Sequence, residues 1–125
     1  MSGLECSIVV ESDCCVVRLR GDLVLDHSSS TRKLLFDCIS EGRPLIAEMS
    51  MVDYIDSSGV ASLVEAYHWS LRQGTGFCLA AVSPGVFLVL ELVRLNRVFP
   101  MYLTVGEGLQ KFGTNGKTPF FPSAE

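Results

Sequence analysis

The chain of 125 residues has the length of one domain, and a composition that is 48% hydrophobic and 19% charged is too apolar for a disordered protein. The net charge is −4 and the basic residues are scattered, so no basic stripe is available to bind a nucleic acid. Because no apolar run reaches the ~20 residues of a membrane span, we expect no insertion into a membrane.

The cysteines and histidines indicate a reduced protein without metal. The five cysteines are odd in number and include no CxxC pair, and the N-terminus lacks the pattern of a secretory signal peptide. These features predict free thiols and a cytoplasmic protein. The only histidines, His27 and His68, show no clustered ligand spacing, so we expect no metal and no other cofactor.

The first third of the chain predicts a hairpin followed by a helix. Residues 4–10 and 14–20 are rich in strand-forming residues, and a short polar link joins them, which is typical of two antiparallel strands. The serines at 28–30 are helix-start signals, and apolar residues recur at helical spacing between Thr31 and Glu41.

From residue 45 onward, strand-like and helix-like segments alternate. Apolar residues from Val60 to Leu71 follow the i, i+3, i+4, i+7 spacing of an amphipathic helix, and a Ser-Pro pair at Ser83 opens a later helix. The predicted segments are a strand at 45–49 that continues to 55, the helix from 60, a buried strand at 77–82, the helix from 84, a short strand at 101–103 and a helical turn at 107–112.

The order of these elements, β-β-α-β-α-β-α-β-α, predicts an α/β fold with right-handed crossovers. The leading hairpin makes the sheet mixed rather than purely parallel. We expect one domain over residues 1–112. The tail, 113–125, is expected to be loose or irregularly docked, because several glycines and prolines interrupt it.

The segment Asp56-Ser57-Ser58-Gly59 lies where a strand gives way to an amphipathic helix. A helix N-terminus carries unpaired N–H groups and a partial positive charge, so it accommodates an oxyanion such as a phosphate. A phosphorylated Ser57 would gain a charge of about −1.5 to −2 beside Asp56. Taken alone, the four residues favour an ordinary helix cap, because Ser and Asp are common caps.

The segments around this motif change that interpretation. They are the strand end Arg18-Leu19-Arg20-Gly21-Asp22-Leu23, the run Leu45 to Ile55 that leads into the motif, and the later strand and Ser-Pro helix from Ala80 to Leu95. Together with the motif they resemble the STAS domain of anti-sigma factor antagonists, over nearly the whole chain. The resemblance implies a single STAS-type α/β domain. It implies a mixed sheet of four or five strands with about four helices packed mainly on one face, and no enzymatic activity.

The resemblance also implies a phosphorylation switch at Ser57, the first serine of the motif. A partner serine kinase, the anti-sigma factor, would phosphorylate Ser57, and a serine phosphatase would reset it. The unphosphorylated protein would bind the kinase and so release a sigma factor. We expect the partner to contact residues in and around the motif: Asp22, Asp26, Asp56, Ser58, Gly59, Ser62 and Trp69.

Trp69 has two interpretations. On the predicted helix it aligns with Ser58, Ser62 and Glu65, on the face away from the apolar stripe. An exposed Trp there would be an anchor for an interface. The ring could equally fold back against a neighbouring loop.

The helix from Pro84 to Leu95 is apolar nearly all round, so it is either buried on several sides or part of an interface. It could form a homodimer or a partner surface, or the tail with Phe120 and Phe121 could cover it. This helix motivates an alternative function, that of a non-enzymatic STAS subunit in a stress-signalling scaffold or a lipid-transport ATPase complex. A small hydrolase is disfavoured, because no GxSxG elbow or nucleophile triad is apparent.

Overall fold

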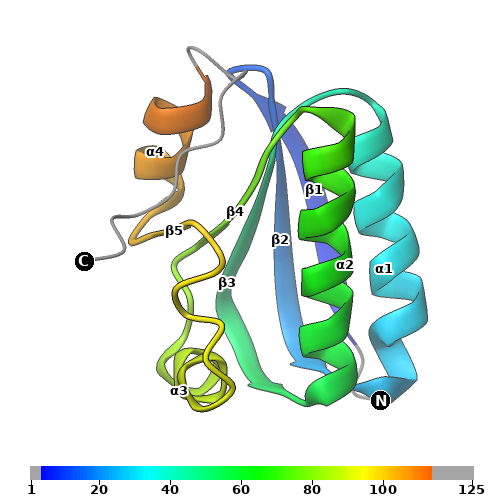
Figure 1. Cartoon of the computed structure of the whole chain (residues 1–125), viewed down its shortest axis with the longest axis vertical. Coiled ribbons are helices and arrows are strands. Elements are labelled where there is room, and N and C mark those ends of the chain that lie inside the picture. The colour runs from blue at the N-terminus through cyan, green and yellow to red at the C-terminus, as the bar shows by residue number, and fades with distance from the viewer. Residues whose placement is uncertain (1–3, 114–125) are drawn as a thin grey trace.

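Five strands form one sheet, in the order β1-β2-β3-β4-β5, in the computed structural model, which describes residues 4–113 (Figure 1). β1 is antiparallel to β2, and every later strand is parallel to its neighbour. The predicted mixed α/β sheet is therefore confirmed. The strands are β1 (Glu5–Glu11), β2 (Cys14–Leu23), β3 (Leu45–Ile55), β4 (Phe77–Ala80) and β5 (Met101–Tyr102).

Helices lie on both sides of this sheet, but the two long ones share one side. In Figure 1, α1 and α2 run side by side over one face, whereas α4 lies on the opposite side and α3 at one end. No helix among residues 4–113 is long and apolar enough to cross a membrane. The helices are α1 (Leu25–Ser40), α2 (Ser57–Gln73), α3 (Pro84–Leu92), α4 (Val105–Gly108) and the π-helical η1 (Leu109–Gly113).

Because successive side chains of a strand point to opposite faces, the central strands contribute to two apolar clusters. In β2, Cys15 joins the main core beneath α1 and α2, whereas the adjacent Cys14 joins a second cluster on the other face. α4 and η1 pack against this second cluster. α4 approaches so closely at Gly108 that a Cβ there would lie 3.2 Å from Cδ1 of Ile46.

α1 differs most from its sequence-based prediction. It begins at Leu25 rather than near Thr31. The serines predicted to precede the helix lie within it, where Ser28 Oγ donates to the carbonyl of Leu25 (3.2 Å) and Ser30 Oγ to that of His27 (3.1 Å). Those hydroxyls are bound to the helix itself, so the cap must come from elsewhere. The predicted tail lies outside the described residues, apart from Gly113.

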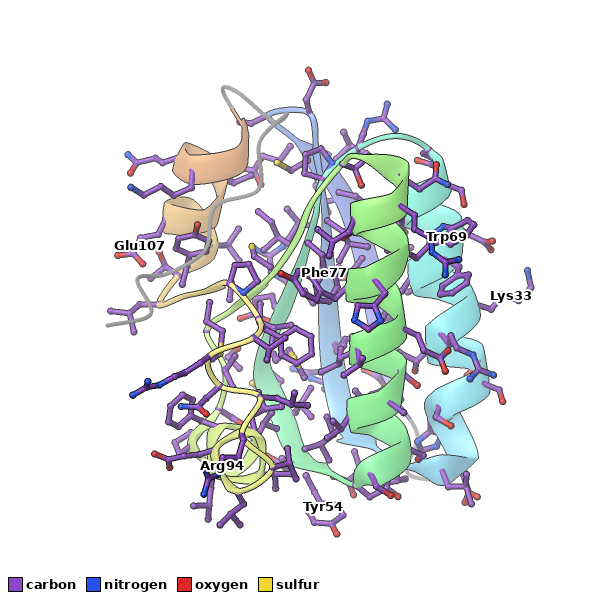
Figure 2. The ribbon with its side chains drawn as sticks, in the orientation of Figure 1. Lys33, Tyr54, Trp69, Phe77, Arg94 and Glu107 are labelled. Carbon is purple, nitrogen blue, oxygen red and sulfur yellow. The ribbon has the colours of Figure 1, made fainter. Side chains whose placement is uncertain are left out.

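Three aromatic rings fix α2 against the sheet. Phe77 of β4, Tyr67 of α2 and Phe99, just before β5, have mutual ring-centroid distances of 5.7–6.2 Å. Phe77 is fully buried, and Figure 2 shows it between α2 and the sheet. Each ring belongs to a different segment, so the cluster joins parts of the chain that are distant in sequence.

We predict that Phe77→Ala lowers the free energy of unfolding by about 3–5 kcal/mol, because it leaves a cavity among the rings. Urea unfolding followed by circular dichroism measures this change. The matched control is Leu103→Ala, whose side chain is 81% exposed and whose loss should cost about 0.5 kcal/mol or less. Equal losses in the two variants would contradict the central position of Phe77.

Candidate functional site at the start of helix α2

The motif residues lie where β3 ends and α2 begins. Asp56 has an extended backbone and is the N-cap of α2, and Ser57 is the first helical residue. Leu23, at the end of β2, is the register partner of Ile55, and the chain turns from Leu23 directly into α1. The starts of α1 and α2 therefore meet at the carboxyl ends of β2 and β3 (Figure 1).

The Asp56 carboxylate binds both helices. Its Oδ1 accepts from the backbone N–H of Ser58 (3.0 Å) and of Gly59 (3.1 Å), as an N-cap residue does. Its Oδ2 accepts a hydrogen bond of 3.2 Å from the N–H of Leu25, which is the first residue of α1. Val24, the N-cap position of α1, makes no capping bond of its own with its side chain. The Asp56 carboxylate thus caps α1 as well as its own helix α2, which explains why α1 begins as early as Leu25.

The same contacts hold the pKa of the Asp56 carboxyl group below its usual value. The hydrogen bond from the Ser58 hydroxyl is the largest cause, followed by the one from the Gly59 N–H. Asp56 is therefore ionised at neutral pH, directly beside the first residue of α2.

The two adjacent serines are not equivalent. Ser58 Oγ donates to Asp56 Oδ1 at 2.6 Å, and Ser58 is half-buried. Ser57 is exposed, and its hydroxyl makes no hydrogen bond with any residue in 4–113. Of the two hydroxyls, only that of Ser57 is presented to an external reagent.

Gly59 was predicted to contact a partner, but it is buried. A Cβ at this position would collide with the carbonyl oxygen of Leu23 and lie 2.7 Å from Cγ1 of Ile55. The absence of a side chain lets the first turn of α2 press against the ends of β2 and β3. Gly59 therefore positions the motif, and its side of the helix is not available to a partner.

Ser62 was also predicted to lie on an accessible face, and this is wrong. It is 1% exposed, and its Oγ donates to the carbonyls of Ser58 (3.1 Å) and Ser28 (3.3 Å). The second of these acceptors belongs to α1. The packing of α1 against α2 therefore covers a position that the helical pattern of α2 alone places on the outer face.

Trp69 folds back rather than standing free. Its ring stacks on Phe36 of α1, with centroids 5.2 Å apart and planes inclined by 5°. Its Nε1 lies 3.4 Å from the Ser40 hydroxyl, to which it donates. In Figure 2, Trp69 lies between α2 and α1. One face of the Trp69 ring thus packs within the fold, against a residue of helix α1 rather than against a loop.

The other predicted contact residues lie on the surface near the cap. Asp22, near the end of β2, and Asp26, in the first turn of α1, are both exposed, and Leu25 between them is bound to Asp56. Sequence reasoning missed two apolar side chains here, Leu25 (71% exposed) and Tyr54 (54% exposed). Tyr54 points away from the fold in Figure 2. Leu25 is the first residue of α1, whose start the local sequence did not reveal, and Tyr54 belongs to the end of β3.

Comparison with known protein families decides the family. The model of the STAS domain matches residues 5–108. The chain belongs to the STAS domain family. The match begins at β1 and ends at the last residue of α4, so it covers the whole sheet and all four α-helices of this STAS domain.

Solved structures share this fold at low sequence identity. Protein TM1081 of Thermotoga maritima is 22% identical with a TM-score of 0.79, over 85% of this chain and 92% of that one. An anti-sigma factor antagonist from Mycobacterium paratuberculosis is 21% identical with a TM-score of 0.79, over 87% of this chain and 93% of that one. The Bacillus anti-sigma factor antagonist SpoIIAA, unphosphorylated, is 22% identical with a TM-score of 0.72, over 87% and 95%.

We predict that Gly59→Ala lowers the free energy of unfolding by about 1–3 kcal/mol, because the added methyl group overpacks the contact with Leu23 and Ile55. Urea unfolding measures the loss. Gly106→Ala is the control, since the nearest atom to a Cβ there is 3.7 Å away. A Gly59→Ala protein as stable as the control would contradict the close approach.

A second prediction concerns the pH dependence of Asp56. Its pKa is lower in the folded protein than in the unfolded chain, so its ionised form stabilises the fold above the unfolded pKa. That contribution is lost as pH falls through the lowered folded pKa. Asp56→Asn keeps a capping side chain but cannot titrate. The stability advantage of the wild type over Asp56→Asn should be constant above about pH 5 and shrink below about pH 4.

Chemical denaturation across this pH range tests the prediction. The two proteins are compared directly at each pH, because their other carboxylates are identical. An advantage that grows as pH falls would mean that Asp56 is not held ionised by its contacts.

Proposed function

We propose that this STAS domain is an anti-sigma factor antagonist, a cytoplasmic protein-binding module switched by phosphorylation of Ser57. One observation carries the proposal: Ser57, the first residue of α2, is exposed and its hydroxyl makes no hydrogen bond within the described part of the chain, whereas the neighbouring Ser58 hydroxyl is bound to Asp56. In this proposal the protein is not an enzyme. Its unphosphorylated form binds an anti-sigma factor that is itself a serine kinase, and a sigma factor is released.

The surroundings of Ser57 supply the surface for such a partner. Leu25 and Tyr54 are large, exposed apolar groups near the cap, and Asp22 and Asp26 are exposed carboxylates beside them. Apolar contacts of this kind contribute to affinity, and the carboxylates select the cationic groups of the correct partner. SpoIIAA, which shares the fold, has been solved in both unphosphorylated and phosphorylated forms.

Phosphorylation would break the complex through charge and desolvation. In a kinase complex the Ser57 hydroxyl must lie in line with the terminal phosphate of the nucleotide. Once Ser57 carries a phosphate, that dianion faces the phosphates of the remaining nucleotide and the ionised Asp56, and it must also be desolvated. Release follows, and a serine phosphatase restores the binding form.

The test uses Ser57→Ala, Ser57→Asp and a purified anti-sigma factor serine kinase from the same organism. We expect the wild type and Ser57→Ala to bind the kinase with ADP, and Ser57→Asp to bind at least about tenfold more weakly. An Asp at the first position of a helix is favourable for the helix itself, so weaker binding would not reflect unfolding. Isothermal titration calorimetry measures the affinities.

With ATP, mass spectrometry should place one phosphate on Ser57 of the wild type and none on Ser57→Ala. Ser58→Ala is the matched control and should still accept phosphate at Ser57. Phosphate on another residue, or Ser57→Asp binding as tightly as the wild type, would refute the switch.

A second candidate function is a non-enzymatic subunit of a stress-signalling scaffold or a lipid-transport ATPase complex. The exposed apolar side chains of α3 favour it, since Leu88 and Leu92 are 55% and 72% exposed. Co-purification with a transporter ATPase, together with full function of Ser57→Ala, would support this candidate over the first. A homodimer through α3 would appear as a concentration-dependent dimer that Leu92→Lys abolishes.

A further inference from the structure

β1 is an edge strand whose seven residues are all exposed. Its register with β2 is continuous from Glu5 to Glu11, with no bulge that would turn the strand away. No strand among residues 4–113 pairs with its outer side. An edge strand of this kind presents a row of unpaired N–H and C=O groups to any extended segment that approaches.

The centre of this edge is apolar. Ile8, Val9 and Val10 are consecutive β-branched residues, exposed to 46%, 46% and 51%. Natural sheets protect their edges with lysine, proline, bulges or a covering element. The described centre of β1 has none of these devices. Its backbone and side chains therefore suit the addition of a further strand.

Charge determines which strand fits. Glu5 and Glu11 bracket the apolar centre. A second copy paired in register would place glutamate opposite glutamate, Glu5 against Glu11 if antiparallel and each against itself if parallel. Like charges directly opposite destabilise a strand pair. Arg20 lies 3.8 Å from Glu5, but both side chains are largely exposed, so this ion pair is weak and leaves Glu5 available.

We propose that β1 accepts, as an additional strand, an extended segment of another protein that carries a basic residue at each end of an apolar centre. Five residues separate Glu5 from Glu11, so the two basic residues of the segment should be separated by five apolar or small residues. Main-chain hydrogen bonds provide the affinity and the terminal charges provide the selectivity. Ser57 takes no part in this contact, so the proposal stands or falls independently of the phosphorylation switch.

The probe is a fluorescent peptide, Lys-Val-Val-Ile-Thr-Val-Lys, with blocked ends. In either direction its lysines come opposite Glu5 and Glu11. We expect saturable binding by fluorescence anisotropy, and about tenfold weaker binding of the same peptide with glutamate at both ends. Raised salt should reduce this difference, because the charges are exposed. Equal binding of the two peptides would overturn the role of the glutamates.

N-methylated peptides test whether the contact is a strand pairing. Alternate residues of a strand direct their N–H groups to opposite edges, so methyl groups on one set of residues should abolish binding and methyl groups on the other set should not. Loss of binding with both sets, or with neither, would show that the peptide does not add as a strand.

Protein variants locate the contact. Val10→Lys should abolish peptide binding, whereas Leu88→Lys, at a similarly exposed apolar position on α3, should leave it unchanged. Glu5→Lys with Glu11→Lys should reverse the preference towards the glutamate-ended peptide. Circular dichroism and thermal unfolding confirm that each variant is folded. Binding lost in Leu88→Lys but kept in Val10→Lys would overturn the proposal, as would a dimer of the wild type that Val10→Lys abolishes.

Discussion

The starts of two helices depend on one carboxylate. Asp56 accepts from the first turn of α2 through one oxygen and from the first residue of α1 through the other. The ends of β2 and β3 are in register at the same place, so the cap also joins the helical layer to the sheet. The position of Ser57, the start of α1 and the exposure of Leu25 all follow from this arrangement.

The cap also limits what a phosphate on Ser57 could do within the protein. The N–H groups of Ser58 and Gly59, which would otherwise attract an anion, are already bound to Asp56. A phosphate could accept hydrogen bonds from these two N–H groups only by displacing the Asp56 carboxylate. Its charge would therefore be directed outward, where a partner or a phosphatase meets it, rather than neutralised by the helix that carries it.

Local patterns were sufficient for most of the fold. The apolar stripe from Val60 to Leu71 predicted α2, and the alternation of strand and helix predicted a mixed sheet; both are confirmed. The start of α1 was not predicted, because its cap, Asp56, lies 31 residues further along the chain. Contacts between residues that are distant in sequence leave no periodicity to detect.

At the candidate site, too, local patterns predicted some features, whereas others depend on contacts between residues distant in sequence. The motif predicted the junction of β3 and α2, and the Ser57 hydroxyl makes no hydrogen bond with any residue in 4–113, whereas that of Ser58 is bound to Asp56. The burial of Ser62 and the stacking of Trp69 on Phe36 arise from the packing of α1 on α2, so one helix considered alone misplaced both side chains. Family membership is shown by the match over residues 5–108.

The second apolar cluster has a consequence for biosynthesis. The buried strand side chains that form it, Cys14, Val16, Ile46, Cys78 and Ala80, all precede α4 and η1 in the chain. These two elements, which pack against the cluster, are the last ones before residue 114. A ribosome releases these segments in that order, and domains complete their folding only when all their parts have emerged. One face of the nascent sheet thus stays open to water and to chaperones until α4 and η1 have emerged.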